Sequence, residues 1–258
     1  MKSAAGVALL ALALARTAAA CDYPGPPPGS GEATAEGSGI LWAGFSDATT
    51  RYDHGILGDR IEAGGLRVRT AGKGPCELFA LLGAESVFED LAPRIGDLND
   101  DGRNDVVAVE TDIRTGASLA VYSVVGGRLR KIAATPNIGR SHRWLAPVGI
   151  ADFNADGYTD VAYVETPHIG GTLRIWSMRG GRRLREIARV AGLANHLIGD
   201  DFISGGVRRC DGKRPVIVVA DQRWTRVIGV VFHEGRPVVS ELGPNRGQGS
   251  FRKALTCG

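Results

Sequence analysis

The sequence has little of several features that would point to common protein classes. Only 6% of its 258 residues are aromatic, and no segment approaches 18 consecutive apolar residues, so no transmembrane segment is expected. It lacks a Gly-x-Ser-x-Gly elbow, a His-Glu-x-x-His pair and a glycine-rich phosphate loop before a helix. The five histidines show no metal-ligand spacing. These absences argue against the common motif-bearing hydrolases, zinc peptidases and nucleotide-binding enzymes.

What the sequence does contain favours β-structure. Glycine is abundant at 37 residues, and the apolar residues, 43% of the chain with alanine and cysteine included, fall mostly into short runs. Short apolar runs separated by glycine are typical of strands joined by tight turns. The chain is also long enough to bury a substantial core. We therefore expect an all-β fold.

The first 20 residues have the pattern of a signal peptide. Lys2 precedes an apolar run over residues 4–15, and three alanines at 18–20 form a small-residue cleavage site. Export predicts a periplasmic or extracellular protein. Cleavage would remove Lys2 and Arg16 and lower the net charge from the +3 of the full sequence to +1. The sequence therefore gives no support for a nucleic-acid partner.

Four cysteines in an exported chain predict two disulfides. Three pairings are open, and Cys21–Cys76 with Cys210–Cys257 is preferred because it would pin both termini to the body of the protein. Cys21 also follows three alanines, so a lipid anchor at Cys21 is an alternative. It is disfavoured because lipidation would leave an odd cysteine, and because the leucine usual three residues before a lipidated cysteine is absent.

Residues 21–39 are rich in Pro, Gly, Ser and Glu and are expected to be a linker. An internal repeat follows within a domain expected over 40–258. Leu91-Ala92-Pro93 recurs as residues 145–147, and the strand-like runs 105–111 and 160–166 recur more weakly at 215–221. Apolar alternation around Gly126-Gly127 and Gly180-Gly181 predicts hairpins.

Each unit of 50–55 residues thus holds about four short strands, which are the dimensions of a propeller blade. The units fall at roughly 40–88, 89–142, 143–195 and 196–245. The sequence predicts a small β-propeller of four or five four-stranded blades, with an open β-sandwich as the competing architecture. Closure into a ring would remove the exposed sheet edges.

Two acidic loops stand at the same place in consecutive repeats, over residues 97–105 and 152–160. Oxygen-bearing side chains occupy positions 1, 3, 5 and 9 of each loop, and position 6 is glycine. Ca²⁺ prefers six to eight oxygen ligands, several of them anionic. An EF-hand is excluded because its twelfth position needs a bidentate Glu, where this chain has Ala108 or Tyr163. A lone Asp-Gly is more often a plain hairpin turn, but the identical spacing in two repeats favours a Ca²⁺ site.

The strand–loop–strand arrangement of these loops resembles the FG-GAP or VCBS repeat of integrin-α-like propellers. The resemblance covers residues 40–245 and is strongest over 91–187. It implies a propeller whose Ca²⁺ loops join the first and second strands of a blade. The ligands that it implies are Asp97, Asn99, Asp101, Arg103 (through its carbonyl) and Asp105 in the first loop, and Asp152, Asn154, Asp156, Tyr158 and Asp160 in the second. The first and last repeats lose this spacing, and no metal is expected there.

The turns opposite the acidic loops would form the other rim of the central channel. Aligning the repeats predicts that this rim carries a ligand site made of His54, Glu89, Asp90, Glu110, Arg143, Trp144, Glu165 and His196. The competing interpretation is that these residues cap strands and pair with one another. No catalytic residues are predicted. The leading function is therefore an exported, calcium-binding, non-enzymatic module that binds a protein or a carbohydrate. A hydrolase or lyase working in the channel and a purely structural envelope protein are the alternatives.

Overall fold

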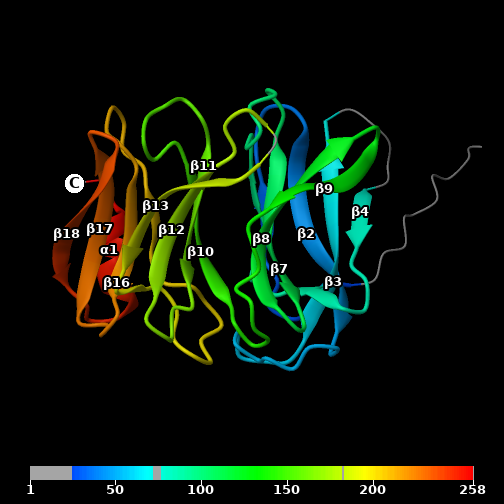
Figure 1. The fold of residues 1–258 in the computed structure, drawn as a ribbon, viewed down its shortest axis with the longest axis horizontal. Coiled ribbons are helices and arrows are strands. Elements are labelled where there is room, and N and C mark those ends of the chain that lie inside the picture. The colour runs from blue at the N-terminus through cyan, green and yellow to red at the C-terminus, as the bar shows by residue number, and fades with distance from the viewer. Residues whose placement is uncertain (1–24, 72–76, 182, 258) are drawn as a thin grey trace, which may run out of the picture.

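The computed structural model describes residues 25–71, 77–181 and 183–257. They form 18 strands and one short helix, with every strand pair antiparallel, so the predicted all-β fold is confirmed (Figure 1). No helix among these residues is both long and apolar enough to cross a membrane. The expected signal peptide at residues 1–20 lies outside the described residues.

The strands follow the predicted repeat. The first unit contains β1 (Glu32–Thr34), β2 (Ile40–Thr49), β3 (Glu62–Thr70) and β4 (Leu78–Leu81). The second contains β6 (Arg94–Gly96), β7 (Asp105–Asp112), β8 (Gly116–Val125) and β9 (Arg128–Ala134), and β5 (Ser86–Phe88) pairs with both β3 and β7 to join the two units into one sheet. The third sheet is β10 (Leu145–Ala151), β11 (Asp160–Glu165), β12 (Thr172–Ser177) and β13 (Arg185–Ala191). The last contains β14 (Leu193–Ala194), β15 (Gly206–Arg208), β16 (Val216–Asp221), β17 (Arg226–His233) and β18 (Arg236–Pro244).

The central strand of each repeat is buried on both faces, which explains its continuous apolar sequence. In β7, Val106 and Ala108 face the core shared with the first unit, whereas Val107 and Val109 face the core shared with the third. Because successive side chains of a strand point to opposite faces, a strand between two packed sheets needs apolar residues at both odd and even positions. The same alternation recurs in β11 and β16. The sheets therefore stack face to face like blades.

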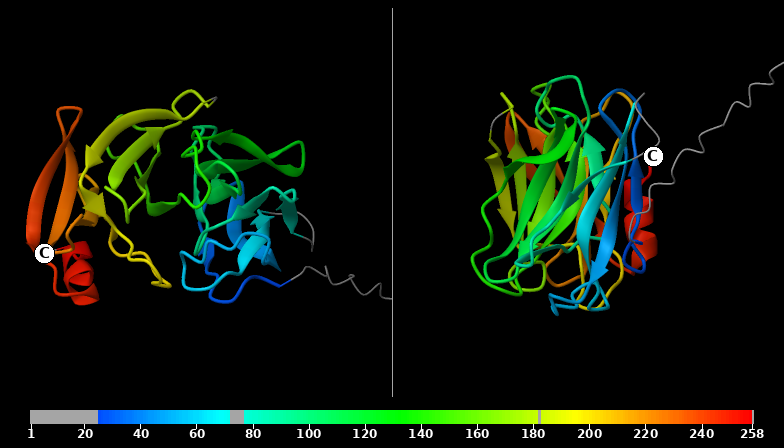
Figure 2. Two further views of the ribbon diagram at one scale, coloured as in Figure 1. Left: turned by 60° about the horizontal axis from the view of Figure 1, so that its bottom comes forward. Right: turned by 90° about the vertical axis from the view of Figure 1, so that its right-hand side faces the viewer.

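The stack forms an arc whose first and last units lie at opposite ends, with β4 and β18 at the extremes of the long axis (Figures 1 and 2). Helix α1 (Gln248–Leu255) covers the outer face of the last sheet, where Phe251 packs with Val218 and Ala220. At the other end the ring of Trp42 is covered by Arg69, whose guanidinium carbon lies 4.2 Å from the ring centroid. Each end of the arc thus has its own cap in place of another sheet.

Loops close the inner side of the arc. Ile56 and Leu57, between β2 and β3, pack in the same apolar cluster as Ile203 from the last unit. A Cβ built on Gly58 would stand 3.4 Å from the carbonyl oxygen of Gly199, so these two loops touch. This contact brings the first and last units together over the interior, where both pockets described below are found.

Two of the predictions about the chain ends can be compared with the structure. The Cys210–Cys257 disulfide is confirmed, and it ties the chain after α1 to the segment between β15 and β16. Cys21 and Cys76 lie outside the described residues. The expected linker over 21–39 needs correction, because Glu32–Thr34 form β1 and pair with β2. Glu32 accepts a hydrogen bond from the indole of Trp42 at 2.8 Å, a long-range partner that composition alone does not reveal.

Candidate functional site

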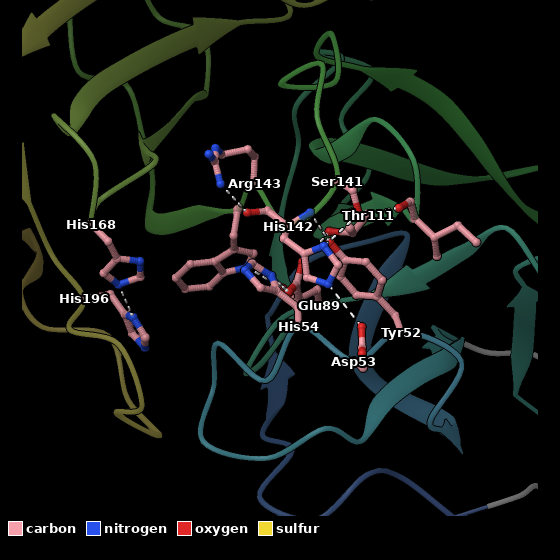
Figure 3. Close-up of polar contacts among 12 residues, drawn as sticks. Tyr52, Asp53, His54, Glu89, Thr111, Ser141, His142, Arg143, His168 and His196 are labelled. Carbon is pink, nitrogen blue, oxygen red and sulfur yellow. Dashed lines mark hydrogen bonds and ion pairs between the residues drawn. The ribbon is translucent and has the colours of Figure 1, made fainter.

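Four of the five histidines of the chain gather at one rim of the arc (Figure 3). His54 comes from the loop before β3, His142 from the loop before β10, His168 from the loop after β11, and His196 from the loop after β14. They surround Trp144, which is 2% exposed. The loops of four consecutive units thus meet at one place, as the rim of a propeller requires.

A buried carboxylate holds His54. Its Nδ1 lies 2.5 Å from Oε1 of Glu89, which is completely buried. The second oxygen of Glu89 accepts a hydrogen bond from the Thr111 hydroxyl at 2.7 Å, and its backbone carbonyl accepts one from the Trp144 indole at 2.8 Å. Burial raises the pKa of Glu89, and the hydrogen bond from His54 opposes that rise. These contacts fix the imidazole of His54 in one orientation.

His142 packs against the same group from the other side. Its ring is stacked on Tyr52 with 5.1 Å between centroids, and it lies edge-on to His54 at the same distance. The backbone N–H of His142 donates to the Tyr52 hydroxyl at 2.8 Å, and its Nε2 lies 3.1 Å from Oδ1 of Asp53. Burial and the nearby Glu89 raise the pKa of Tyr52 to about 12, so its hydroxyl stays protonated.

His168 and His196 form a hydrogen-bonded pair. Nε2 of His168 lies 3.0 Å from Nδ1 of His196, and Nε2 of His196 lies 3.0 Å from the carbonyl oxygen of Asp200. Because that carbonyl can only accept, His196 carries its proton on Nε2, and His168 therefore donates from its own Nε2. Burial, followed by the neighbouring His196, lowers the pKa of His168 to about 4, and burial also lowers the pKa of His196. Both rings are neutral at pH 7, and Nδ1 of His168 is left as an acceptor.

These side chains line a pocket of about 280 Å³. The walls carry three imidazoles, the Trp144 ring and exposed isoleucines, of which Ile169 is 61% and Ile198 is 73% exposed. Arg143 stands at its edge and donates to the carbonyl of His142 at 3.0 Å. No carboxylate of the described residues pairs with this guanidinium. The pocket therefore combines an apolar wall, hydrogen-bonding imidazole rings and a guanidinium that no carboxylate of the described residues neutralises.

The structure gathers some of the predicted rim residues and separates others. His54, Glu89, Arg143, Trp144 and His196 belong to the cluster. The side chain of Asp90 does not join the cluster. Its Oδ2 accepts from Arg94 at 2.5 Å and from the backbone N–H of Val109 at 3.0 Å.

Glu110 and Glu165 do not converge on the rim pocket. The carboxylate of Glu110 accepts from the Tyr122 hydroxyl at 2.7 Å and from Lys131 at 2.8 Å. In the following sheet, Glu165 on β11 accepts from Arg174 on the neighbouring strand β12 at 2.9 Å. Their equivalent positions in the repeat reflect equivalent contacts within each sheet.

The rim prediction left out two members of the cluster, His142 and His168. His142 and His196 lie near the same point of successive repeats, and this spacing was the available signal for His142. His168 lies in a loop of the third unit only and has no counterpart that would single it out.

The two acidic loops share most of their hydrogen bonds and differ in the side-chain amide of the third residue, which donates to Asp105 from Asn99 but to Asp156 from Asn154. Asp97 accepts from the backbone N–H groups of Asp101 and Gly102 at 3.2 and 2.8 Å, and Asp152 accepts from those of Asp156 and Gly157 at 3.1 and 2.9 Å. Asn99 and Asn154 accept from the fifth residue of their loops at 3.0 and 3.1 Å, and Asp101 and Asp156 accept from the seventh, Arg103 and Tyr158, at 3.0 and 3.1 Å. Asp105 and Asp160 are buried and accept from the second residue of their loops at 3.1 Å.

The donor set of these loops suits a hard cation. Burial, the largest cause, raises the pKa of Asp105 to about 6 and of Asp160 to about 7, and Oδ1 of Asp160 is buried without a hydrogen-bond partner among the described residues. A bare carboxylate oxygen at the end of an Asp-x-Asn-x-Asp-Gly loop fits Ca²⁺ chemistry. The side-chain oxygens bond to amides of their own loop, and among the described residues no three Asp, Glu, His or Cys side chains are grouped closely enough to hold a metal ion.

Comparison with known proteins places part of the chain in a family. No curated protein matches the sequence. Among solved structures, the crystal structure of rhamnogalacturonan lyase YesW is similar with a TM-score of 0.41 and 14% identity, over 72% of this chain and 43% of the lyase chain. The present chain therefore spans less than half the length of that lyase. The model of the FG-GAP-like repeat matches residues 97–163, which include both acidic loops. Residues 97–163 of this chain are thus an FG-GAP-like repeat, in agreement with the resemblance seen in the sequence.

Proposed function

We propose that the protein is an exported, calcium-binding repeat protein that acts as a non-enzymatic binding module, with its ligand site in the rim pocket beside Arg143. The observation that carries this proposal is the guanidinium of Arg143, which pairs with no carboxylate of the described residues and stands at the edge of a pocket lined by imidazoles. A guanidinium binds carboxylates through two parallel hydrogen bonds. Neutral imidazoles can both donate and accept, as sugar hydroxyl groups require. The chemistry favours an acidic carbohydrate as the ligand.

The size of the pocket is consistent with this choice. Its volume of about 280 Å³ is near the lower end of known ligand pockets, which begin at about 300 Å³. It suits one or two sugar residues of a longer chain. Trp144 is too deeply buried to stack on a sugar, so contacts with the ring faces would come from Ile169 and Ile198 at the mouth.

The test compares Arg143→Ala with Arg140→Ala. Arg140 is an exposed residue in the same loop that does not line the pocket, so its substitution is a matched control. Binding is measured by calorimetry with oligogalacturonates and with neutral oligogalactosides of the same length. Loss of a charge-assisted hydrogen bond of about 1.5–3 kcal/mol should weaken binding of the acidic sugar roughly 10- to 100-fold in Arg143→Ala only. Equal affinity for both sugars, or binding only to acidic peptides, would overturn the carbohydrate assignment.

The second part of the proposal is that the acidic loops bind Ca²⁺. Asp97, Asn99, Asp101 and Asp105, with the carbonyl of Arg103, would hold one ion, and the equivalent residues Asp152, Asn154, Asp156, Asp160 and the carbonyl of Tyr158 would hold another. When bound, Ca²⁺ would neutralise the carboxylates of each loop and fix the connection between the first two strands of its sheet. Both loops lie between strands of one sheet, before β7 and before β11, which supports a stabilising role.

Millimolar Ca²⁺ should raise the melting temperature of the EDTA-treated protein, because extracellular sites typically bind at about 10⁻⁴–10⁻³ M. The increase should become smaller in Asp97→Ala and in Asp152→Ala and be absent in the double variant. An unchanged melting temperature in the wild type, or a full increase in the double variant, would contradict the proposal.

Export is the third part, and it rests on the signal-like pattern of residues 1–20. When the full chain is expressed in a bacterium, the mature protein recovered outside the cytoplasm should begin at Cys21. Mass spectrometry distinguishes this product from a lipidated Cys21 and from an uncleaved cytoplasmic chain.

A lyase or hydrolase is the second candidate function, and the His54–Glu89 pair is the observation that favours it. A buried carboxylate that orients an imidazole is the usual arrangement of a general base. No described residue bonds to Nε2 of His54, and His54 lines the pocket next to Arg143. Incubation with oligogalacturonates, followed by chromatography, tests this reading. Cleavage that disappears in His54→Ala would establish an enzyme. Sugars that stay intact would favour the non-enzymatic binding module.

A further inference from the structure

A second pocket, of about 210 Å³, lies beside the first unit and is strongly acidic. Four acidic residues line it: Asp59 in the loop before β3, Glu62 at the start of β3, Asp90 before β6 and Asp201 from the last unit. None of the described residues in its walls is basic. Leu57, Ile61, Ala63, Phe88 and Leu91 form its apolar walls. The pocket thus has several carboxylates and an apolar surface in its walls.

Glu62 is the most unusual of these carboxylates. It is 4% exposed, and no hydrogen bond or ion pair joins its side chain to another described residue. Burial is the largest cause that raises its pKa to about 9, and Glu89, Asp59 and Asp90 add to the effect by repulsion. A buried carboxyl without a partner is costly to ionise and is an unfavourable element of a core.

The carboxyl of Asp90 is only partly satisfied. Its Oδ2 is engaged by Arg94 and by Val109, but its Oδ1 is buried and has no partner. The side chain itself is fully buried. Asp90 lines the cavity, but its carboxyl is fully buried and paired with Arg94, so Glu62 is the carboxyl that brings an unpartnered group to the cavity.

The chemistry of the cavity selects the kind of cation. A bare metal ion requires several ligands at short range, and no three acidic, histidine or cysteine side chains of the described residues are grouped for one. The volume equals the share of about seven waters in the liquid, at about 30 Å³ each. That is room for a charged nitrogen and a short alkyl chain, and the alkyl chain would lie against Leu57 and Phe88.

We propose that this cavity binds a primary ammonium or guanidinium group on an alkyl chain, with Glu62 as its acceptor. The cation supplies the donor that the Glu62 carboxyl lacks, and the apolar wall buries the carbon chain. Such a group is carried by a free alkylamine or by a Lys or Arg side chain of another protein. The site is separate from the rim pocket: Asp90 faces it, whereas the adjacent Glu89 holds His54. The inference is independent of the function proposed above.

Binding should depend on pH. The charged groups that face or lie near Glu62 are Asp59, Asp90, Asp201, Glu89, Tyr52 and Arg94, the last through its pair with Asp90. At neutral pH Glu62 is protonated, and a cation at the site would make it release its proton. Affinity should therefore rise between pH 6 and pH 8.

Calorimetry with n-butylamine and n-butylguanidine tests the proposal, with n-butanol as the uncharged control. Both cations should bind the wild type and n-butanol should not, and the measured heat should change with the ionisation enthalpy of the buffer. Glu62→Gln should weaken binding at least tenfold. Glu85→Gln, which changes an exposed acid paired with Arg114 outside the pocket, should leave binding unchanged.

Two further measurements complete the test. A peptide with one central lysine, compared with n-butylamine, shows the source of the cation: tighter binding of the peptide indicates a protein side chain, and equal binding indicates a small amine. Thermal melting of Glu62→Gln verifies that this variant is folded. Failure of both cations to bind the wild type, equal binding by folded Glu62→Gln, or displacement of the amine by Ca²⁺ in the Asp97→Ala, Asp152→Ala double variant would overturn the proposal.

Discussion

Replacing Glu62 by glutamine should stabilise the protein, and the gain should depend on pH. Burial raises the pKa of Glu62 to about 9 in the folded protein, against an ordinary value of 4.5. A carboxyl with a raised pKa contributes its full stability below the unfolded value, and that contribution is lost as the pH rises through the folded value. Between these limits the unfolded chain is ionised while the folded protein must hold a proton.

The magnitude follows from the difference in pKa. Each pH unit above 4.5 costs about 1.36 kcal/mol, so at pH 7 the wild type loses about 3 kcal/mol relative to a side chain that never ionises. Glutamine has nearly the same shape and carries no ionisable proton. Glu62→Gln should therefore exceed the wild type in free energy of unfolding by about 3 kcal/mol at pH 7, and by nearly nothing at pH 4.5.

Urea unfolding of both proteins at pH 4.5, 6, 7 and 8 gives the measurement, since all other titrating groups are shared and cancel in the difference. The difference between the proteins should grow steadily with pH. A constant difference at every pH would refute the reasoning, because it would mean that Glu62 ionises in the folded protein as it does in the unfolded chain. A loss of stability at pH 7 would show that Glu62 has a partner that glutamine cannot replace.

Two further predictions concern the last unit of the arc. Replacing both Cys210 and Cys257 by serine opens a crosslink between residues 47 apart and should cost about 4 kcal/mol by the loop-entropy relation, measured by urea unfolding against the same protein with the disulfide intact. An unchanged stability would show that the terminal segment is held by other contacts. Phe251→Ala empties the position by which α1 covers the last sheet and should cost about 3–5 kcal/mol, whereas Arg252→Ala on the exposed side of the helix should cost little. Equal effects of the two substitutions would mean that α1 does not pack on β16.

The strands and the acidic loops could be predicted from the sequence because local rules govern them. A strand packed between two sheets needs apolar residues at both odd and even positions, and β7 and β11 have them. The two loops share the backbone hydrogen bonds to their carboxylates because the same acidic residues stand at positions 1, 5 and 9. Such features depend on neighbours a few residues away.

The candidate site was harder to predict because it depends on side-chain direction and on contacts between distant loops. Glu110 lies near the end of β7, but its side chain points across the sheet to Tyr122 and Lys131. Glu89 and Asp90 are adjacent, yet one holds His54 and the other faces the acidic pocket. The role of Glu62 depends on its having no hydrogen-bond or ion-pair partner among the described residues, which only the folded arrangement reveals.

The most direct test of the rim pocket is a titration of the histidine rings observed by NMR. The protein is labelled with ¹⁵N at histidine, and trigalacturonate is added at pH 7. The imidazole signals of His54, His142 and His168, which line the pocket, should shift together, while that of the exposed His233 on β17 stays in place. Binding that leaves the three pocket signals unmoved, or that shifts only His233, would contradict a ligand site at this rim.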